Sequence, residues 1–171
     1  MSKFVGVFVF ICTVGTLHAA QNGAATVELK NAQGQSVGTA SLTPAKDGGV
    51  AVALDLKNMT PGRHALHFHQ TPSCEGPAFT SAGGHYNPEN KKHGLQNPEG
   101  PHAGDIPNFT ADAKGKAKTT VVAAGVTLGD DPHSVFTGGG TALVVHAKAD
   151  DGKTDPSGNS GDRIACGVIT K

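Results

Sequence analysis

The chain has 171 residues, of which 37% are hydrophobic, 14 are basic and 14 are acidic. This length is enough for one domain with a hydrophobic core of its own. The balanced charge provides neither the basic surface that binds nucleic acid nor a polybasic segment that binds an anionic membrane, so neither partner is expected.

The first twenty residues differ from the rest and indicate a secretory signal peptide. Lys3 provides a short basic start, residues 4–14 form an apolar run, and the small pair Ala19-Ala20 offers a cleavage site. A transmembrane anchor is the alternative interpretation, but this run is too short to span a bilayer. We therefore expect residues 1–20 to be removed and residues 21–171 to form one exported domain, with 13 basic and 14 acidic residues left.

The mature chain has the pattern of β-structure throughout. Apolar residues alternate along short segments, and turn signals such as Asp47-Gly48-Gly49 separate them. No helix of useful length and no internal repeat is predicted. Short strands separated by turns favour an all-β sandwich or barrel. The expected strands cover residues 26–30, 37–42, 50–56, 64–69, 118–123, 142–146 and 163–169.

Two polar segments, residues 70–108 and 150–161, lack this alternation. A loop as long as the first is unusual inside a compact domain and is usually functional. The mature chain also keeps two cysteines, Cys74 and Cys166, because Cys12 leaves with the signal peptide. In an oxidising compartment we expect them to form one disulfide, with two free buried thiols as the alternative.

Six histidines and one aspartate are the most informative residues. His67 and His69 are two residues apart in an apolar strand, so both rings lie on the same face. A single histidine on a strand is more often packed or exposed than a ligand, but such a pair, followed by further candidates, indicates a metal site. Imidazole suits copper and zinc. The candidate ligands are His67, His69, His85, His93, His102, Asp105 and His146.

Several stretches around these residues closely resemble the copper/zinc superoxide dismutases, in the order of that family and from Gly62 almost to the C-terminus. They are Gly62-Arg-His-Ala-Leu-His-Phe-His69, Ser81-Ala-Gly-Gly-His-Tyr-Asn-Pro88, Lys91-Lys-His-Gly94, Gly100-Pro-His-Ala-Gly-Asp-Ile-Pro-Asn108, Leu143-Val-Val-His-Ala-Lys-Ala-Asp-Asp151 and Gly158-Asn-Ser-Gly-Asp-Arg-Ile-Ala-Cys-Gly167. The resemblance implies a Greek-key β-barrel or sandwich of about eight antiparallel strands with two long functional loops.

The resemblance also implies two metal sites that share one histidine. Four imidazoles suit a copper ion that cycles between two oxidation states, whereas three imidazoles and a carboxylate suit a closed, structural zinc site. The copper ligands implied are His67, His69, His85 and His146. The zinc ligands implied are His85, His93, His102 and Asp105.

Further residues resemble supporting groups of that family. Asp150 resembles the aspartate that links a copper histidine to a zinc histidine, here His67 and His93, and fixes their orientation. Arg163 resembles the arginine at the mouth of the active channel, where it holds a small anion. Of the remaining histidines, His64 is interpreted as a hydrogen-bonded structural residue and His133 as a surface residue.

The implied activity is dismutation of the superoxide anion to dioxygen and hydrogen peroxide, with Arg163 orienting the anion and His85 taking a proton when its link to copper breaks. A metal-carrying relative without turnover is a second hypothesis, and a zinc hydrolase, which needs an open metal position, is a third.

The second loop is shorter than in cytosolic eukaryotic members, so other cations are candidates for steering the substrate, namely Lys91, Lys92 and Lys148. This short loop and the signal peptide resemble the exported bacterial class. We expect the periplasm as the location, with the extracellular space as the alternative. The family assembles through different surfaces, which leaves a homodimer open.

Overall fold

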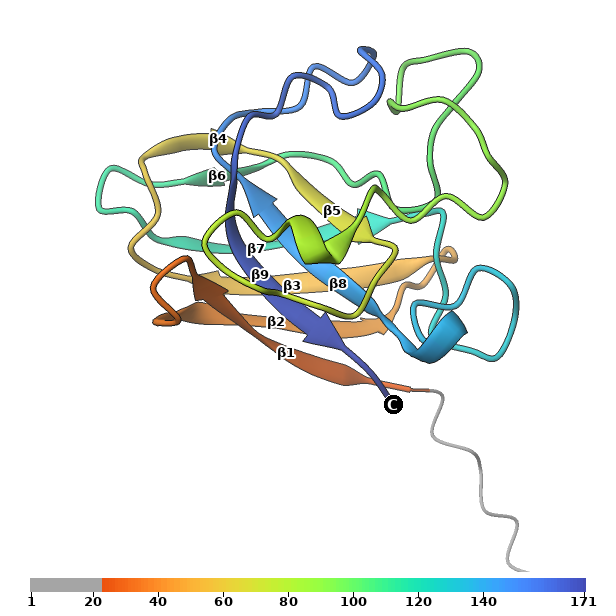
Figure 1. Cartoon of the computed structure of the whole chain (residues 1–171), viewed down its shortest axis with the longest axis horizontal. Coiled ribbons are helices and arrows are strands. Elements are labelled where there is room, and N and C mark those ends of the chain that lie inside the picture. Colours follow the sequence, from red (N-terminus) through yellow and green to blue (C-terminus); the bar gives the residue numbers. More distant parts are fainter. Residues whose placement is uncertain (1–22) are drawn as a thin grey trace, which may run out of the picture.

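The computed structural model describes residues 23–171 (Figure 1). The predicted signal peptide, residues 1–20, lies outside these residues. Within the described part of the chain, no helix is long and apolar enough to cross a membrane.

Strands dominate the described residues, as predicted. Seven strands form one antiparallel sheet in the order β5-β8-β9-β1-β2-β3-β7, and β4 and β6 pair separately. Two three-residue 3₁₀ turns, Thr80–Ala82 and Thr137–Gly139, are the helical elements found within residues 23–171. The strands are β1 (Ala25–Asn31), β2 (Ser36–Pro44), β3 (Val50–Leu56), β4 (Gly62–His64), β5 (Leu66–His69), β6 (Phe109–Ala111), β7 (Ala117–Ala123), β8 (Thr141–His146) and β9 (Arg163–Ile169).

The alternation in the sequence explains how the sheet buries its core. In β3, Val50, Val52, Leu54 and Leu56 are buried, whereas the residues between them are partly or fully exposed. Successive side chains of a strand point to opposite faces, so one face of the curled sheet packs inward. The last strand, β9, pairs with both β8 and β1, which joins the two ends of the domain (Figure 1).

The structure corrects one predicted strand and adds another. Residues 64–69 form two strands, not one, because β4 pairs with β6 whereas β5 pairs with β8. The break falls at Ala65, whose N–H donates to the carbonyl of Lys148 and whose carbonyl accepts from the N–H of His146. The unpredicted strand, β6, has only three residues, too few for a recognisable alternation.

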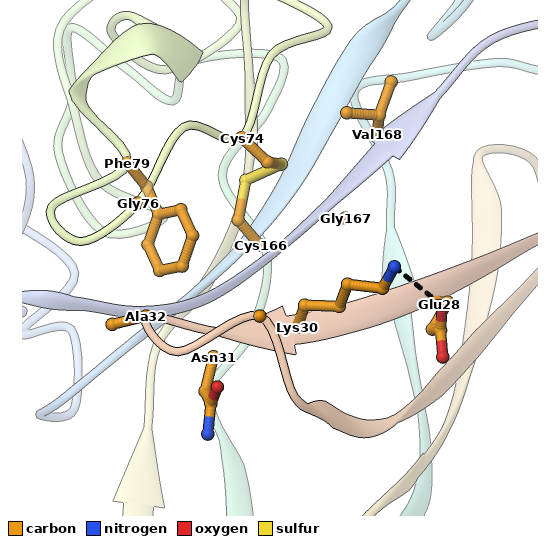
Figure 2. Close-up of a pocket in the computed structure, with 11 residues that line it drawn as sticks. Glu28, Lys30, Asn31, Ala32, Cys74, Gly76, Phe79, Cys166, Gly167 and Val168 are labelled. Atoms are coloured by element: carbon orange, nitrogen blue, oxygen red, sulfur yellow. Dashed lines mark ion pairs between the residues drawn. A yellow bond between two sulfur atoms is a disulfide. The ribbon is translucent and has the colours of Figure 1, made fainter.

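The first long loop, residues 70–108, connects β5 to β6 and is tied to the sheet by the predicted disulfide. Cys74 in the loop is bonded to Cys166 in β9, with their Cα atoms 5.7 Å apart. Figure 2 shows this bond beside Phe79 in the wall of a surface cavity of about 340 Å³, which also borders Lys30 of β1. The disulfide therefore holds the start of the loop against the sheet.

We expect the double variant Cys74→Ser/Cys166→Ser to lose roughly 4 kcal/mol of its free energy of unfolding, because the bond closes a long loop and restricts the unfolded chain. Urea unfolding at equilibrium measures this change. Reduced wild-type protein is the matched control and should unfold like the variant. Equal stability of the variant and the oxidised wild type would contradict the prediction.

Candidate metal centre

Three of the predicted ligands are placed by paired strands. His67 and His69 lie in β5, which pairs with β8, and His146 is the last residue of β8. The register between β8 and β9 shifts after Val145, so that His146 lies opposite Arg163. Such a bulge changes the direction of neighbouring side chains. Here the bulge places the candidate ligand His146 opposite Arg163, the arginine predicted to bind the anion.

The long loop brings further candidates to the same strand through its backbone. Isolated β-bridges pair His67 with Asp105 and His69 with His85. Between them, the N–H of Phe68 donates to the carbonyl of Gly104 at 3.0 Å, and its carbonyl accepts from the N–H of Tyr86 at 2.8 Å. Two segments that are distant from each other within the loop thus lie beside β5.

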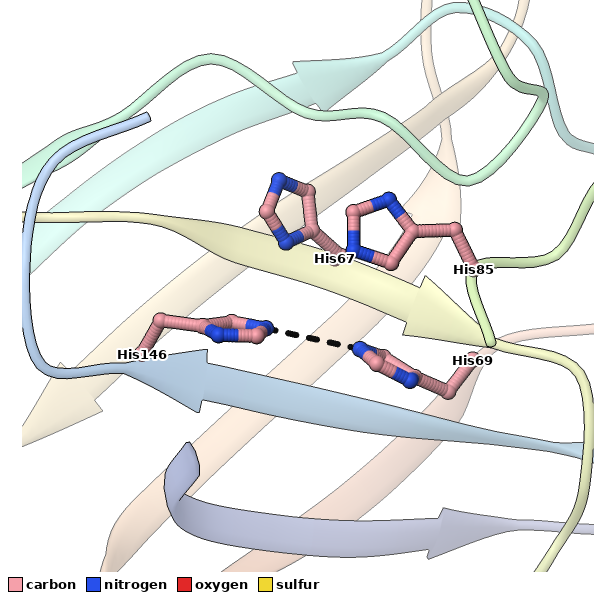
Figure 3. A group of neighbouring side chains, drawn as sticks. All are labelled: His67, His69, His85 and His146. Carbon is pink, nitrogen blue, oxygen red and sulfur yellow. Dashed lines mark hydrogen bonds between the residues drawn. The ribbon is translucent and has the colours of Figure 1, made fainter. Parts of the chain in front are cut away.

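His67, His69, His85 and His146 form the first group of possible ligands. All four are buried, and each offers one ring nitrogen within 4.8 Å of the others. Figure 3 shows the four rings turned toward a common centre, with His146 and His69 facing each other across it. The structure therefore brings together the four residues predicted to hold copper.

The hydrogen bonds of these rings identify the nitrogens that remain available. His67 Nε2 lies 2.7 Å from Asp150 Oδ2, His69 Nδ1 lies 2.9 Å from the carbonyl of Gly83, and His146 Nδ1 lies 3.2 Å from the carbonyl of Gly161. Each of these partners can only accept a hydrogen bond, so the named nitrogen carries the hydrogen and donates it. The opposite nitrogen of each ring then carries a lone pair.

The nitrogens that carry these lone pairs face one another, and no N–H group lies between them to donate a hydrogen bond. His69 Nε2 and His146 Nε2 are 3.4 Å apart, and neither carries a hydrogen in these tautomers. His67 Nδ1 and His85 Nε2 are buried with no hydrogen-bond partner. Buried polar atoms usually have a partner, and exceptions call for an explanation. A cation at the centre of the group would satisfy all four nitrogens, and imidazole nitrogens suit copper.

The pKa values of these rings agree with a cation site. Burial lowers the pKa of His69 to about 2, of His85 to about 4 and of His146 to about 3, and it also lowers the pKa of His67. The four rings are therefore neutral at neutral pH, which is the form of histidine that binds metals.

A second group gathers around Asp105. Its Oδ1 lies 2.9 Å from His85 Nδ1, 3.1 Å from His93 Nδ1 and 3.4 Å from His102 Nδ1. The four groups that lie within 4.8 Å of one another here are His67, His85, His93 and Asp105, so His67 and His85 belong to both groups. His102 adjoins this set, because its Nδ1 is also 3.4 Å from His85 Nδ1.

The second group differs from the first in its charge. Burial opposes protonation of His93, but the nearby carboxylates of Asp105 and Asp150 outweigh it and raise the pKa of His93 to about 9. Burial would raise the pKa of Asp105, yet its contacts with His102, His85 and His93 hold that pKa far below its ordinary value. Three imidazoles and one carboxylate suit zinc, which would replace the proton of His93.

Asp150 links the two groups. Its Oδ2 lies 2.7 Å from His67 Nε2 and 2.9 Å from His93 Nε2, the two rings that the family resemblance implies. The contact with His93 does not have the geometry of a hydrogen bond, so the attraction between Asp150 and His93 is chiefly electrostatic. Gly158 makes room for this carboxylate, since a Cβ on Gly158 would overlap Asp150 Oδ1.

Sequence reasoning missed the residue that holds Asp150. The side-chain amide of Asn108 donates to the carbonyl of Asp150 and accepts from its N–H, both at 2.8 Å. Asn108 ends one of the stretches that carry the family resemblance, and this position was the only signal in the sequence. The sequence also provided no indication of Asp155 in the second loop, whose carboxylate accepts a hydrogen bond from the N–H of His93.

Arg163 lies beside a cavity of about 520 Å³ that is also lined by His69, His85 and His146. Its guanidinium donates to the carbonyl of Phe79 at 2.6 Å and to the carbonyl of Gly83 at 2.7 Å. The carbonyl of Gly83 also accepts from His69 Nδ1. The loop that the disulfide tethers thus positions both the arginine and a candidate ligand.

The two other histidines of residues 23–171, His64 and His133, lie outside both groups. The ring of His64 contacts the carbonyls of His146 and Thr60 at 2.8 and 2.7 Å, which agrees with its interpretation as a structural residue. His133 is partly exposed, which agrees with a place at the surface, and its Nδ1 lies 2.9 Å from the carbonyl of Gly125.

The family comparison agrees with this geometry. The sequence profile described as "Copper/zinc superoxide dismutase (SODC)" matches residues 36–169. The chain belongs to the copper/zinc superoxide dismutase family. The two groups described above, one of histidines and one of histidines with an aspartate, agree with this membership.

Individual relatives support the same membership. The chain is 45% identical to "Superoxide dismutase [Cu-Zn] 2" of Aquifex aeolicus over 171 residues, which is 99% of each chain. Among solved structures, it is similar to a SOD-like protein from Bacillus subtilis, with a TM-score of 0.82 and 37% identity over 86% of this chain and 99% of that one. It is also similar to the Cu/Zn superoxide dismutase from Brucella abortus, with a TM-score of 0.70 and 35% identity over 86% of this chain and 99% of that one.

We expect the metal-free protein to be less stable at pH 5 than at pH 7. Histidines with lowered pKa values stay neutral in the folded state but gain a proton in the unfolded state below about pH 6.5. The free energy of unfolding therefore decreases as the pH is lowered from 7 to 5. His93 has the opposite effect, but the histidines of the first group outnumber it. Urea unfolding of chelator-treated protein at the two pH values measures the difference. Equal or greater stability at pH 5 would contradict the assignment of neutral rings.

Proposed function

We propose that the mature chain catalyses the dismutation of superoxide to dioxygen and hydrogen peroxide. The observation that carries this proposal is the pair of buried donor groups that share His67 and His85, one made of neutral imidazoles and the other containing a carboxylate. Membership of the copper/zinc superoxide dismutase family indicates superoxide as the substrate.

The proposed copper ligands follow from the nitrogens that hydrogen bonding leaves available, and the proposed zinc ligands follow from the nitrogens that lie near Asp105 Oδ1. His67 would bind copper through Nδ1, and His69, His85 and His146 would bind it through Nε2. His85, His93 and His102 would bind zinc through Nδ1, together with Asp105 Oδ1. His85 is the proposed bridge because its Nε2 is free and its Nδ1 faces Asp105, whereas His67 Nε2 is engaged by Asp150.

Copper, when bound, supplies the one-electron cycle that oxidises one superoxide and reduces the next. The residues of the chain would orient the anion and handle the proton. Arg163 borders the cavity beside the copper-like group and offers a positive charge to the anion. His85 could hold a proton at Nε2 while its Nδ1 stays with the zinc-like group, and this would be one of the two protons that hydrogen peroxide requires, the other coming from solvent water.

The cations proposed to steer the substrate differ in their surroundings. Lys91 Nζ lies 2.5 Å from Glu89, and Lys92 Nζ lies 3.8 Å from Asp155, so nearby carboxylates offset both charges. The side chain of Lys148 lies along Gly161, which lines the cavity with Arg163. Lys148 is therefore the lysine best placed to add to the positive field there.

Export completes the proposal. We infer that residues 1–20 direct the chain to the periplasm and that residues 21–171 form the mature enzyme. The disulfide between Cys74 and Cys166 supports an oxidising compartment. The homodimer that the family resemblance leaves open is tested by size-exclusion chromatography with light scattering on the mature protein.

We expect the mature protein loaded with copper and zinc to accelerate the loss of superoxide, and the His146→Ala variant to lose at least about 100-fold of this activity, because one copper ligand is removed. Stopped-flow spectroscopy of superoxide decay, with metal analysis of each sample, measures both. His133→Ala, which changes a histidine outside both groups, is the control. Wild-type protein that retains both metals without accelerating the decay would favour a metal-carrying role instead.

We expect Arg163→Ala to lower kcat/KM for superoxide by about 10- to 100-fold, because a hydrogen bond to a charged group contributes about 1.5–3 kcal/mol. Arg163→Lys should retain part of the rate, since the charge remains without the planar donor pair. Arg63→Ala, which removes an exposed arginine of β4, is the matched control. Equal rates for Arg163→Ala and Arg63→Ala would exclude the proposed role.

A further inference from the structure

A carboxylate of the second long loop reaches the zinc-like group from outside. Asp155 Oδ1 accepts a hydrogen bond from the backbone N–H of His93 at 2.7 Å. The same oxygen lies 3.9 Å from His102 Nε2. The proposed zinc-binding atoms of His93 and His102 are their Nδ1 nitrogens, so Asp155 contacts each residue at a different atom.

Three carboxylates lie close to three different atoms of His93, and only the contact at its backbone N–H is a hydrogen bond. Asp105 Oδ1 lies 3.1 Å from its Nδ1, and Asp150 Oδ2 lies 2.9 Å from its Nε2. Asp155 holds its backbone nitrogen. Asp150 and Asp155 both belong to the second loop, so this loop determines the position of His93 from the ring and from the main chain together.

The loop is built to present Asp155 at this place. Asp151 Oδ1 accepts from the N–H groups of Lys153 and Thr154 at 2.9 and 2.8 Å, and the N–H of Gly158 donates to the carbonyl of Thr154 at 2.6 Å. These bonds close a turn around Asp155. The turn is also packed against the first loop, since the N–H of Gln96 donates to the carbonyl of Gly152 at 2.9 Å.

The contacts of Asp155 outside the zinc-like group explain little of its placement. Lys92 Nζ is 3.8 Å away, and the side chains of this ion pair are 56% and 43% exposed. Exposed ion pairs of this kind contribute little to stability. The hydrogen bond from the N–H of His93 is shorter and also keeps the pKa of Asp155 below its ordinary value.

We propose that Asp155 is a positioning residue for the zinc side of the centre, where it fixes the main chain of His93 and places a negative charge beside the ring of His102. Carboxylates that surround metal-binding histidines orient the rings and strengthen them as donors. Removing this carboxylate should therefore weaken the retention of zinc. The inference rests on the proposed zinc site.

The test compares zinc retention in Asp155→Ala, Asp155→Asn and wild-type protein, all loaded with copper and zinc. We expect Asp155→Ala to release zinc to an excess of a chromogenic chelator about 10- to 100-fold faster than wild type. Asp155→Asn keeps an acceptor for the N–H of His93 but loses the charge, so its rate should lie between the two. Asp47→Ala removes an exposed aspartate from the turn between β2 and β3, outside the second loop, and should behave as wild type.

A second readout separates positioning from a general loss of stability. With cobalt in place of zinc, the visible absorption bands report the geometry around the ion, and they should shift in Asp155→Ala but not in Asp47→Ala. Wild-type release rates and bands in Asp155→Ala would overturn the proposal and leave the proposed function intact. Wild-type release in Asp155→Asn would overturn the contribution of the charge. Wild-type protein that retains no zinc would overturn both this inference and the proposed zinc site.

Discussion

One carboxylate oxygen, Asp150 Oδ2, connects the two halves of the candidate metal centre. It lies between His67 Nε2 and His93 Nε2, that is, between a proposed copper ligand and a proposed zinc ligand. Because this contact makes Nε2 of His67 the donor, its Nδ1 is left to face the other imidazoles. Asn108 holds the main chain of Asp150 on both sides. The orientation of both groups therefore depends on a residue that is proposed to bind neither metal.

The first long loop is ordered by the same sheet that carries the strand histidines. The disulfide ties its start to β9, and backbone bridges place His85 and Asp105 beside β5. The carbonyl of Gly83 accepts from both Arg163 and His69. A displacement of this loop would thus move the anion-binding arginine and a candidate copper ligand together, which links the covalent bond at the surface to the proposed chemistry.

The two groups differ in how they are prepared for a cation. The first consists of neutral rings whose lone pairs converge in a buried space, and burial itself keeps them neutral. In the second, the carboxylates of Asp105 and Asp150 raise the pKa of His93, so this ring binds a proton more readily, and a cation would replace that proton. Neutral imidazoles suit an ion that changes its oxidation state, whereas a carboxylate suits the fixed charge of zinc.

The sequence by itself determined the all-β class, six of the seven predicted strand segments and both long loops, and its motifs predicted the residues of the candidate site, because alternation and short motifs are local properties. The disulfide followed from having two cysteines in an exported chain. The tertiary structure alone decided the break at Ala65, the strand β6, the nitrogen that each histidine leaves free, and the roles of Asn108 and Asp155. These depend on contacts between residues far apart in the chain, and no local pattern of side chains encodes such contacts.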